Sequence, residues 1–446
     1  MKAYPCYKNL DLPWLSEVPS HWDVDRIGRH FFERKTKVSD KDFAPLSVGK
    51  KGVLPQLATV AVTKNGDNRK LVRIGDYVFN SRSDRRGSSG ISEYEGSVSV
   101  IYTVLIPHEL SERWCHYLFR SHAFIEEFYR NGRGIVDDLW TTHFSETRGI
   151  FIPLPPRDEQ DQIVWFLDWK VSEVNNFIRE KRREIKRLQE LRKSIISKAV
   201  TKGGDNWTAM RTPAVFDISK GLSISRSDMK SEGVPCVHYG DIHGECGFEV
   251  NPANHPLGLV SESQIGHSDV YLKYGDFLFC GSSEDLEGSG NFTYFNSKEK
   301  AIAGTDTIRL RAKNTINYRY FAYLFDSQPF RDQIRVRVNG IKVYHPNQSI
   351  LRQTIVITPP EDEQKTIVEY LDKQCADIQA MITAIKSEIA LMTEYRTRVI
   401  SDVVTGKADV RDVVVPDFAV EEAAEDEDDV DDEEAFGEEV EESADD

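Results

Sequence analysis

The sequence has no long apolar run. In its 446 residues, no stretch approaches about 18 uninterrupted apolar positions, so no membrane span is predicted. Residues 1–10 also lack the basic-then-apolar pattern of a signal peptide. Cysteine is scarce, with six scattered residues, and free thiols in the cytoplasm are the simplest interpretation.

Catalytic motifs are missing as well. A DNA adenine methyltransferase needs an Asn-Pro-Pro-aromatic motif for the flipped base, and the nearest match, Asn251–Asn254, does not fit it. A motor needs a phosphate-binding G-x-x-x-x-G-K-[ST] loop, which is absent. Residues 362–365 resemble part of a nuclease E-x-K site, but their copy at 158–161 lacks the lysine, and acids are common at helix starts. The sequence therefore contains no catalytic motif of these three kinds.

Basic residues are absent from the C-terminal end. Residues 417–446 contain 18 acidic residues and no basic one, so the rest of the chain has 55 acidic and 57 basic residues and is nearly neutral. A tail with such repulsion and little to bury is predicted to be disordered. It either acts as a solvated end or competes weakly for the chain's own nucleic-acid surface.

What the sequence does contain is a long internal repeat. Residues 155–168 and 359–372 share Pro-Pro, Asp-Glu-Gln, Ile-Val and Leu-Asp at an offset of 204 positions. Solenoid units run to about 20–50 residues, so this period indicates duplication of a whole domain with its helix. The predicted parts are 1–156 and 204–360 as globular domains, 157–203 and 361–412 as long helices, and 413–446 as the acidic tail.

The two long helices are predicted from their ends and from their periodicity. Pro-Pro precedes each start, acids occupy each first turn, and Gly203 and Gly406 lie at the ends. A seven-residue apolar pattern between the ends predicts a coiled-coil seam, the alternative being two separate amphipathic helices. The seam positions are Val171, Val174, Ile178, Ile185, Leu188 and Ile195 in the first helix and Cys375, Ile378, Ile382, Ile385, Ile389, Met392 and Val399 in the second.

The globular domains are predicted to be mixed α/β. Residues 72–79 and 270–279 each read as a strand, a Gly-Asp turn and another strand. Residues 98–105 and 301–310 are further predicted strands, and Tyr-Leu-Phe at 117–119 and 323–325 lies in short helices. The fold class is therefore α+β, with an internal pseudo-two-fold duplication and the two helices packed as an antiparallel coiled coil.

These features resemble a known family. The paired P-P-x-D-E-Q-x-x-I-V-x-x-L-D segments, together with Tyr7–Leu15 and Val18–Trp22, are similar to the specificity subunit of type I restriction-modification systems. The resemblance covers about residues 1–410 and does not include the acidic tail. It implies two target recognition domains that each read one half of a bipartite, asymmetric DNA site, with the helices setting the gap.

The resemblance also implies partners. Two DNA adenine methyltransferase (modification) subunits would dock on the helices, and restriction (translocase/endonuclease) subunits would join them. By this resemblance the chain itself would not be an enzyme but a non-catalytic subunit of a methyltransferase/endonuclease complex. S-adenosylmethionine, ATP and Mg are then expected on the partner subunits, and none on this chain. The competing hypothesis is a coiled-coil scaffold that pairs two protein ligands without reading DNA.

Candidate DNA contacts are polar and basic side chains on predicted loops, because phosphates and base edges are bound by such groups. The candidates are Lys64, Asn65, Arg69, Lys70, Arg82, Arg85, Arg86 and Arg133 in the first domain, and Arg331, Arg335, Arg337, Lys342 and Tyr344 in the second. The basic run 179–193 is either a solvated flank and partner surface or a phosphate contact.

One cluster is compatible with metal binding. Cys236, His238, His243 and Cys246 lie within eleven residues. Their spacing matches no common structural zinc pattern, and the first domain has no counterpart. We therefore predict no metal site.

Overall fold

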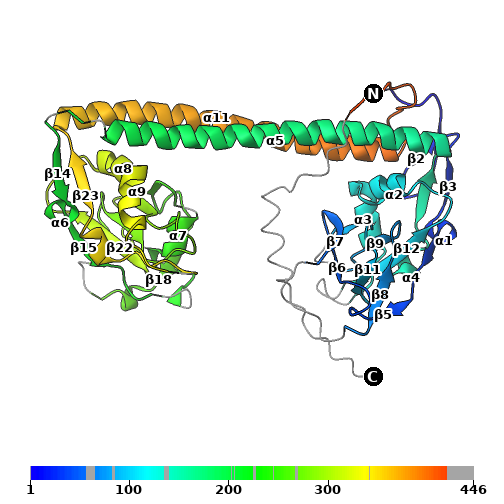
Figure 1. Ribbon diagram of the computed structural model, residues 1–446, viewed down its shortest axis with the longest axis horizontal. Helices are drawn as coiled ribbons and strands as arrows, with labels where there is room; N and C mark the ends of the chain where they lie inside the picture. The colour runs from blue at the N-terminus through cyan, green and yellow to red at the C-terminus, as the bar shows by residue number, and fades with distance from the viewer. Residues whose placement is uncertain are drawn as a thin grey trace. The chain divides into compact units, whose positions relative to one another are not determined.

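The structure is a computed structural model that describes residues 2–56, 66–82, 86–134, 140–201, 203–204, 206–224, 228–244, 246–266, 270–340 and 342–418. It contains two compact units, residues 1–181 with 387–446, and residues 182–386 (Figure 1). Each unit contains one half of each long helix. The sequence-based division instead assigned one whole helix to follow each domain.

The first unit is built from short strands and helices. Its strands are β1 Tyr7–Asn9, β2 Glu17–Pro19, β3 Asp23–Arg26, β4 Phe31–Glu33, β5 Lys37–Val38, β6 Leu46–Gly49, β7 Gly52–Pro55, β8 Arg69–Val72, β9 Tyr77–Phe79, β10 Ser89–Ile91, β11 Gly96–Ser99, β12 Thr103–Pro107 and β13 Phe151–Leu154. Its short helices are α1 Ile27–His30, α2 Glu112–Phe119, α3 His122–Arg130 and α4 Phe144–Thr147. The main sheet has the order β10-β9-β12-β4.

The second unit has a similar strand order. Its strands are β14 Thr208–Arg211, β15 Phe216–Lys220, β16 Val234–Val237, β17 Glu249–Val250, β18 Gly258–Val260, β19 Phe277–Cys280, β20 Phe292–Phe295, β21 Ile302–Ala303, β22 Thr307–Ala312 and β23 Ile355–Thr358. Its short helices are α6 Thr212–Val215, α7 Tyr239–His243, the 3₁₀ helix η4 Glu262–Gln264, α8 Tyr318–Asp326, α9 Gln328–Arg335 and α10 Gln348–Leu351. The main sheet runs β15-β22-β19-β20-β17.

Several predicted strands are divided in the structure. The segment 98–105 contains the end of β11 and the start of β12, which belong to different sheets. The segment 301–310 contains β21 and most of β22, which also belong to different sheets. The Gly-Asp turn of the first unit likewise joins β8 to β9 without pairing them. Before the second turn, Tyr271 makes only an isolated bridge to Ile302. The first Gly-Asp turn therefore joins two strands as predicted, whereas within the described residues no strand leads into the second turn and only β19 follows it.

The long helices are α5 Arg157–Thr201 and α11 Glu361–Val404. A Pro-Pro pair connects each helix to the strand before it. Strand β13, which pairs with β3, leads into α5, and strand β23, which pairs with β14, leads into α11. Gly406, at φ +78°, follows the end of α11, and a Cβ there would lie 2.3 Å from Pro19 Cδ. Glycine is therefore needed after this helix, because other residues rarely adopt a positive φ and because any side chain would collide with Pro19. Among the residues described, no helix combines the length and the hydropathy that crossing a bilayer requires.

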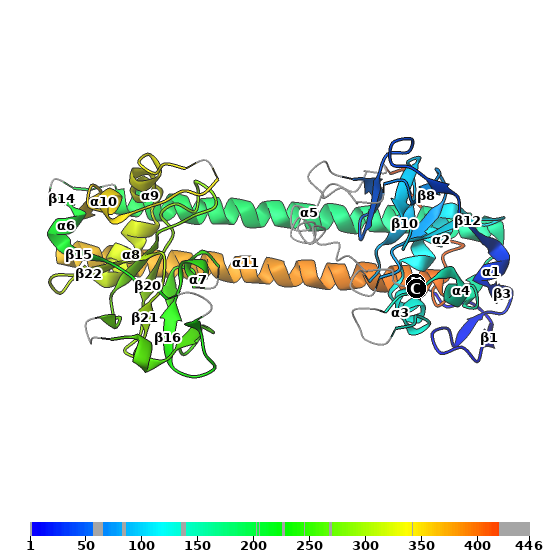
Figure 2. The same ribbon diagram turned by 90° about the horizontal axis from the view of Figure 1, so that it is seen from below.

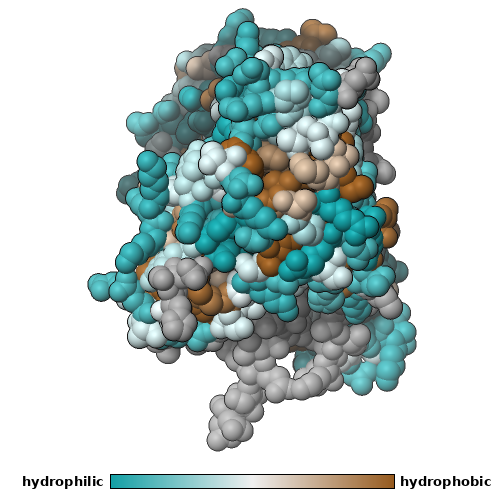
Figure 3. Space-filling view, turned by 90° about the vertical axis from the view of Figure 1, so that its left-hand side faces the viewer, coloured by the Kyte–Doolittle hydropathy of each residue, from teal (hydrophilic) through white to brown (hydrophobic). Residues whose placement is uncertain are grey.

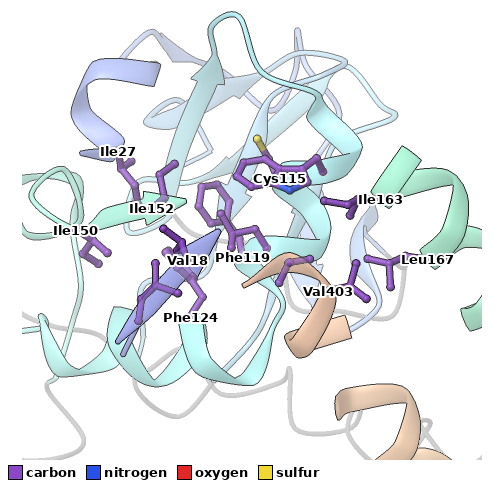
Figure 4. Packing of buried hydrophobic residues seen from close by; sticks show 14 of the residues in the cluster. Val18, Ile27, Cys115, Phe119, Phe124, Ile150, Ile152, Ile163, Leu167 and Val403 are labelled. Carbon is purple, nitrogen blue, oxygen red and sulfur yellow. The ribbon is translucent and has the colours of Figure 1, made fainter. Parts of the chain in front are cut away.

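In the first unit, the N-terminal half of α5 packs against the C-terminal half of α11. Phe119 of α2, Ile163 and Leu167 of α5 and Val403 of α11 belong to one buried cluster (Figure 4). Further along, Lys181 Nζ lies 2.8 Å from Glu388 Oε2. As numbers rise along α5 they fall along α11, so these two segments run in opposite directions.

The second unit joins the complementary halves. Ile196 and Val200 of α5 and Leu371 of α11 share its core with the aromatic residues of β19 and α8. Phe325 of α8 lies 4.9 Å from Phe277 between ring centroids. This aromatic core therefore contacts both helix segments as well as the sheet. Figure 2 shows the ribbons of α8 and of the α5 and α11 segments in this unit.

All thirteen predicted seam residues are buried or half-buried, and none is exposed. Three basic residues, Lys181, Arg192 and Arg396, occupy positions where the seven-residue apolar pattern of the helices is interrupted. Each has a partner within its own unit. Lys181 pairs with Glu388, Arg396 donates to Asn175 Oδ1 at 2.5 Å, and Arg192 lies 3.1 Å from Asp326 Oδ2. Satisfied cations at seam positions add directional contacts where apolar packing is interrupted.

Replacing Asp326 with alanine is expected to destabilise the second unit by about 2–3 kcal/mol, because Arg192 and Arg331 would both lose their carboxylate partner. Hydrogen exchange of α9 amides in the full chain measures this loss as faster exchange. Asp332→Ala is the control, since that carboxylate is half-exposed. Equal exchange in the two variants would contradict the assignment.

The segment after α11 is ordered further than predicted. Val413 and Val415 pack against the first core, and Gln162 Nε2 donates to the carbonyl oxygens of Val410 and Val413 at 3.0 Å. Phe418 meets Trp165 edge-to-face at 6.3 Å. The predicted tail boundary at 413 is therefore too early, and residues 419–446 lie outside those described.

Candidate nucleic-acid interface

The aspartate of each Gly-Asp turn is buried and held by arginine. Asp76 receives two hydrogen bonds from Arg34, at 2.6 and 2.8 Å, and Asp276 receives two from Arg311, at 2.8 and 2.6 Å. In both turns the aspartate also accepts from the backbone N–H three residues earlier, at 2.8 Å. The turns are thus structural anchors for β9 and β19, and the candidate loops begin where those strands end.

In the first unit, two predicted loops come together. The Thr142 N–H donates to the Ser81 carbonyl at 3.1 Å, and Thr141 exchanges backbone hydrogen bonds with Arg133 at 2.8 and 2.9 Å. Arg82 also forms a bridge with Thr141. The loop after β9 and the loop before α4 therefore form one surface carrying Arg82 and Arg133, which the sequence had indicated separately.

Two arginines on this surface are well placed for an anionic partner. The side chains of Arg86 and Arg133 are 62% and 84% exposed. Arg86 lies 3.6 Å from the Glu126 carboxylate and Arg133 lies 3.6 Å from the Glu146 carboxylate, both longer than a close ion pair. The Arg86 guanidinium lies 4.3 Å from the centroid of the Tyr129 ring. Exposed ion pairs are weak, so both cations are available to replace a carboxylate with a phosphate.

Arg69 is a correction to the predicted set. It is only 5% exposed and donates from Nε to Ser97 Oγ at 2.9 Å and from Nη2 to the Ser97 carbonyl at 3.0 Å. Its neighbour Lys70 donates to the Tyr102 carbonyl at 2.7 Å, and burial lowers its pKa. Both side chains tie β8 to neighbouring segments, because a charge withdrawn from water must be satisfied by polar partners. Neither is offered to a DNA phosphate in this conformation.

The second unit repeats the loop pairing. Ser283, after β19, and Tyr344, before α10, exchange two backbone hydrogen bonds at 2.9 and 2.8 Å. Arg337 and Lys342 are exposed on this side, whereas Arg331 and Arg335 are mostly buried in contacts with Asp326 and the Glu287 carbonyl. The exposed cations are the candidates for phosphate contact, and the buried ones position the loop.

Lys64, Asn65 and Arg85 lie outside the described part of the chain. Sequence reasoning missed Trp140, whose indole N–H donates to the Tyr129 carbonyl at 3.0 Å and holds the late loop on α3. Trp140 could have been found from the sequence, because it lies 204 positions before Tyr344, and the same offset relates the two long helices.

The cysteine and histidine cluster has no metal-binding arrangement. Within the ranges described, no group of three or more His, Cys, Asp or Glu side chains is placed to hold a metal ion. Burial raises the pKa of the Cys236 thiol to about 12, which disfavours the thiolate that zinc needs. His243 has both ring nitrogens engaged, with the Ser282 carbonyl at 2.9 Å and Asn291 Nδ2 at 3.0 Å.

The nuclease-like segment is an ordinary helix start. Lys365 lies on the first turns of α11, 3.0 Å from Glu361 and 3.8 Å from Asp362, and its side chain is largely exposed. Residues three or four positions apart are neighbours on a helix surface, so these ion pairs are expected there.

All six cysteines are free.

Each globular part meets its long helix through the same contacts. Asp168 of α5 accepts from Tyr117 Oη and Arg113 Nη2, both at 2.7 Å. Asp372 of α11 accepts from Tyr323 Oη and Arg319 Nε, both at 2.6 Å. The recurring tyrosine, arginine and aspartate fix the angle at which each helix leaves its domain, whereas the loops in the two units differ.

Comparison with known proteins agrees with this arrangement. Residues 204–391, which include the second globular part and most of α11, match the type I restriction modification DNA specificity domain. This part of the chain is therefore similar to the specificity domain of type I restriction-modification systems. The specificity subunit of the type I restriction enzyme EcoBI from Escherichia coli is 22% identical over 206 residues, 46% of this chain and 40% of that protein. The chain thus aligns with less than half the length of this relative.

The fold is also shared with a solved structure. A chain from a study of complex assembly and conformational transition of the type I R-M system aligns with 87% of this chain and 98% of its own length. Its TM-score is 0.64 at 18% sequence identity. At that identity the match establishes a common fold, which includes both globular parts because it covers most of the chain.

Proposed function

We propose that this chain is the DNA sequence-specificity subunit of a type I restriction-modification complex, with each globular domain reading one half of a bipartite, asymmetric site. The observation that carries the proposal is the recurrence of one domain-to-helix junction, Asp168 with Tyr117 and Asp372 with Tyr323, beneath dissimilar loops. A constant attachment with variable loops is what two readers of different base sequences require.

The reading surfaces are the paired loops at the ends of β9 and β19. In the first domain, Arg82, Arg86 and Arg133 supply cations for phosphates and for guanine edges. In the second, Arg337, Lys342 and Tyr344 lie on the corresponding side. Figure 3 shows the end of the molecule at the left of Figure 1, where polar side chains surround apolar patches.

The helices form an antiparallel coiled coil that sets the unspecified gap and receives the methyltransferase subunits. Large apolar side chains of the described residues remain exposed along the helices, which supports a protein-docking role. These are Trp165 at 53%, Tyr370 at 51%, Met381 at 54%, Leu391 at 65% and Tyr395 at 40% exposure.

The chain itself supplies specificity and no chemistry in this proposal. S-adenosylmethionine, ATP and Mg act on the methyltransferase and restriction subunits. The free thiols suit the reducing cytoplasm, where such a complex meets its DNA.

Exchanging residues 204–360 for the corresponding domain of a relative with another specificity is expected to change one half of the methylated site and leave the other half and the gap unchanged. Methylation of a randomised DNA library by the chimaera, assembled with its methyltransferase, measures the outcome. The reciprocal exchange of residues 1–156 is the matched control and should change the opposite half.

Two results would overturn the proposal. One is a change in both halves from a single exchange. The other is site-specific methylation that persists when this chain is omitted, which would leave the scaffold hypothesis in place.

A further inference from the structure

The two long helices differ in charge in a way that their duplication does not explain. Residues 179–193 of α5 contain eight basic and three acidic residues, whereas the copy at 383–397 in α11 contains two of each. The apolar seam recurs in both helices, so packing does not require the difference. The difference in charge therefore needs a cause other than the packing of the two helices.

Part of this charge forms an exposed line. Lys186 and Lys193 are seven residues apart on one face of α5, about 10.5 Å along the axis, and Arg187 projects from the adjoining face, about 100° farther round the helix. All three are exposed, and neither Lys186 nor Arg187 forms an ion pair within the described ranges. Their counterparts at an offset of 204 are Ala390, Leu391 and Thr397, which carry no charge.

The line is continuous with the candidate reading surface of the second unit. Lys193 Nζ lies 3.2 Å from Glu287 Oε1, in the loop after β19, and both side chains are more than half exposed. Arg335 of α9 donates to the carbonyl of the same Glu287. The charged face of α5 therefore begins where the loops of this unit lie and extends along the helix away from the Ser197 end.

We propose that Lys186, Arg187 and Lys193 contact the phosphates of the unspecified DNA next to the half-site read by the second domain. This inference rests on the proposed function and adds a sequence-independent contact to it. A spacing of about 10.5 Å corresponds to about three phosphate steps of one strand, at about 3.4 Å each. Charge complementarity favours DNA over a protein partner, and the apolar face of α11, with Leu391, is left for the methyltransferase.

The test uses the triple variant Lys186→Gln, Arg187→Gln and Lys193→Gln in the complex with its methyltransferase subunits. Binding to a duplex carrying the bipartite site is measured by fluorescence anisotropy over a range of NaCl concentrations. Removing three phosphate contacts should reduce the slope of log affinity against log salt by about two to three. The affinity should fall at least about tenfold at low salt, with the same base preference in both half-sites.

The control variant removes the same charge from exposed positions of α11, by Lys365→Gln, Lys373→Gln and Arg398→Gln. It should leave the salt slope within about one unit of the original chain. A second duplex, with neutral methylphosphonates in the gap only, should weaken binding of the original chain and have little effect on the triple variant.

The outcomes separate the two proposals. Equal slopes in the triple and control variants, or a triple variant that loses its methyltransferase subunits, would overturn the phosphate contact while leaving specificity intact. A chain without base preference whose slope still falls in the triple variant would overturn the proposed function alone. Absence of DNA binding by the complex would overturn both.

Discussion

Replacing Asp276 with alanine is expected to unfold the sheet of the second unit locally and to abolish recognition by that domain. The Arg311 guanidinium is mostly buried and would lose both of its charge-assisted hydrogen bonds, and the Lys273 N–H would lose its acceptor. Removing one partner of a buried ion pair costs about 3–5 kcal/mol. Hydrogen exchange of β19 and β22 amides in the full chain should accelerate by at least about 100-fold.

Two variants control this experiment. Asp217→Ala removes a largely exposed carboxylate from β15 of the same sheet and should have little effect. Asp76→Ala removes the equivalent anchor of the first unit and should accelerate exchange in β9 and β12 only. If Asp276→Ala leaves exchange unchanged, Asp276 is not the anchor of its loop.

Lengthening both long helices by one heptad is expected to lengthen the unspecified DNA gap without changing the bases that are read. One heptad would be inserted between Lys181 and Arg182 and another between Lys386 and Ser387, where the two compact units divide. Each insertion keeps the seam period and adds about 10.5 Å, at most about three base pairs. Affinity for the original site should fall about 100-fold or more, because only one half-site can then be contacted.

Methylation of duplexes with a series of gap lengths measures this prediction. A variant in which the existing heptad at 178–184 is replaced by a different heptad with the same apolar pattern is the control, and it should retain the original gap. An unchanged gap in the lengthened chain would mean that the helices do not set the spacing between the half-sites.

The sequence predicted the parts of the molecule that depend on local chemistry. Proline cannot lie inside a helix, and acids favour its first turn, so both helix starts were placed at Arg157 and Glu361 to within a residue. The seven-residue apolar period similarly identified positions that are buried or half-buried in the structure. These signals involve residues that are close in the chain, which is why they could be read without coordinates.

The charged side chains were much less predictable. Arg69 was expected to reach DNA, yet it is satisfied inside the sheet by Ser97, 28 positions away. Arg86 and Arg133 carry the same charge and remain on the surface. An arginine in a sequence indicates the ability to bind an anion, but whether the anion is a neighbouring group or an external phosphate depends on non-local packing.

By itself, the sequence determined where the two long helices begin and which of their faces are apolar, because proline, glycine and hydrophobic periodicity act locally. Only the tertiary structure decided that the loops after β9 and β19 each join a second, distant loop, and that Asp76 and Asp276 face inward to Arg34 and Arg311. Those outcomes depend on strand pairings between residues up to about sixty positions apart, and local propensity does not encode which pairs form.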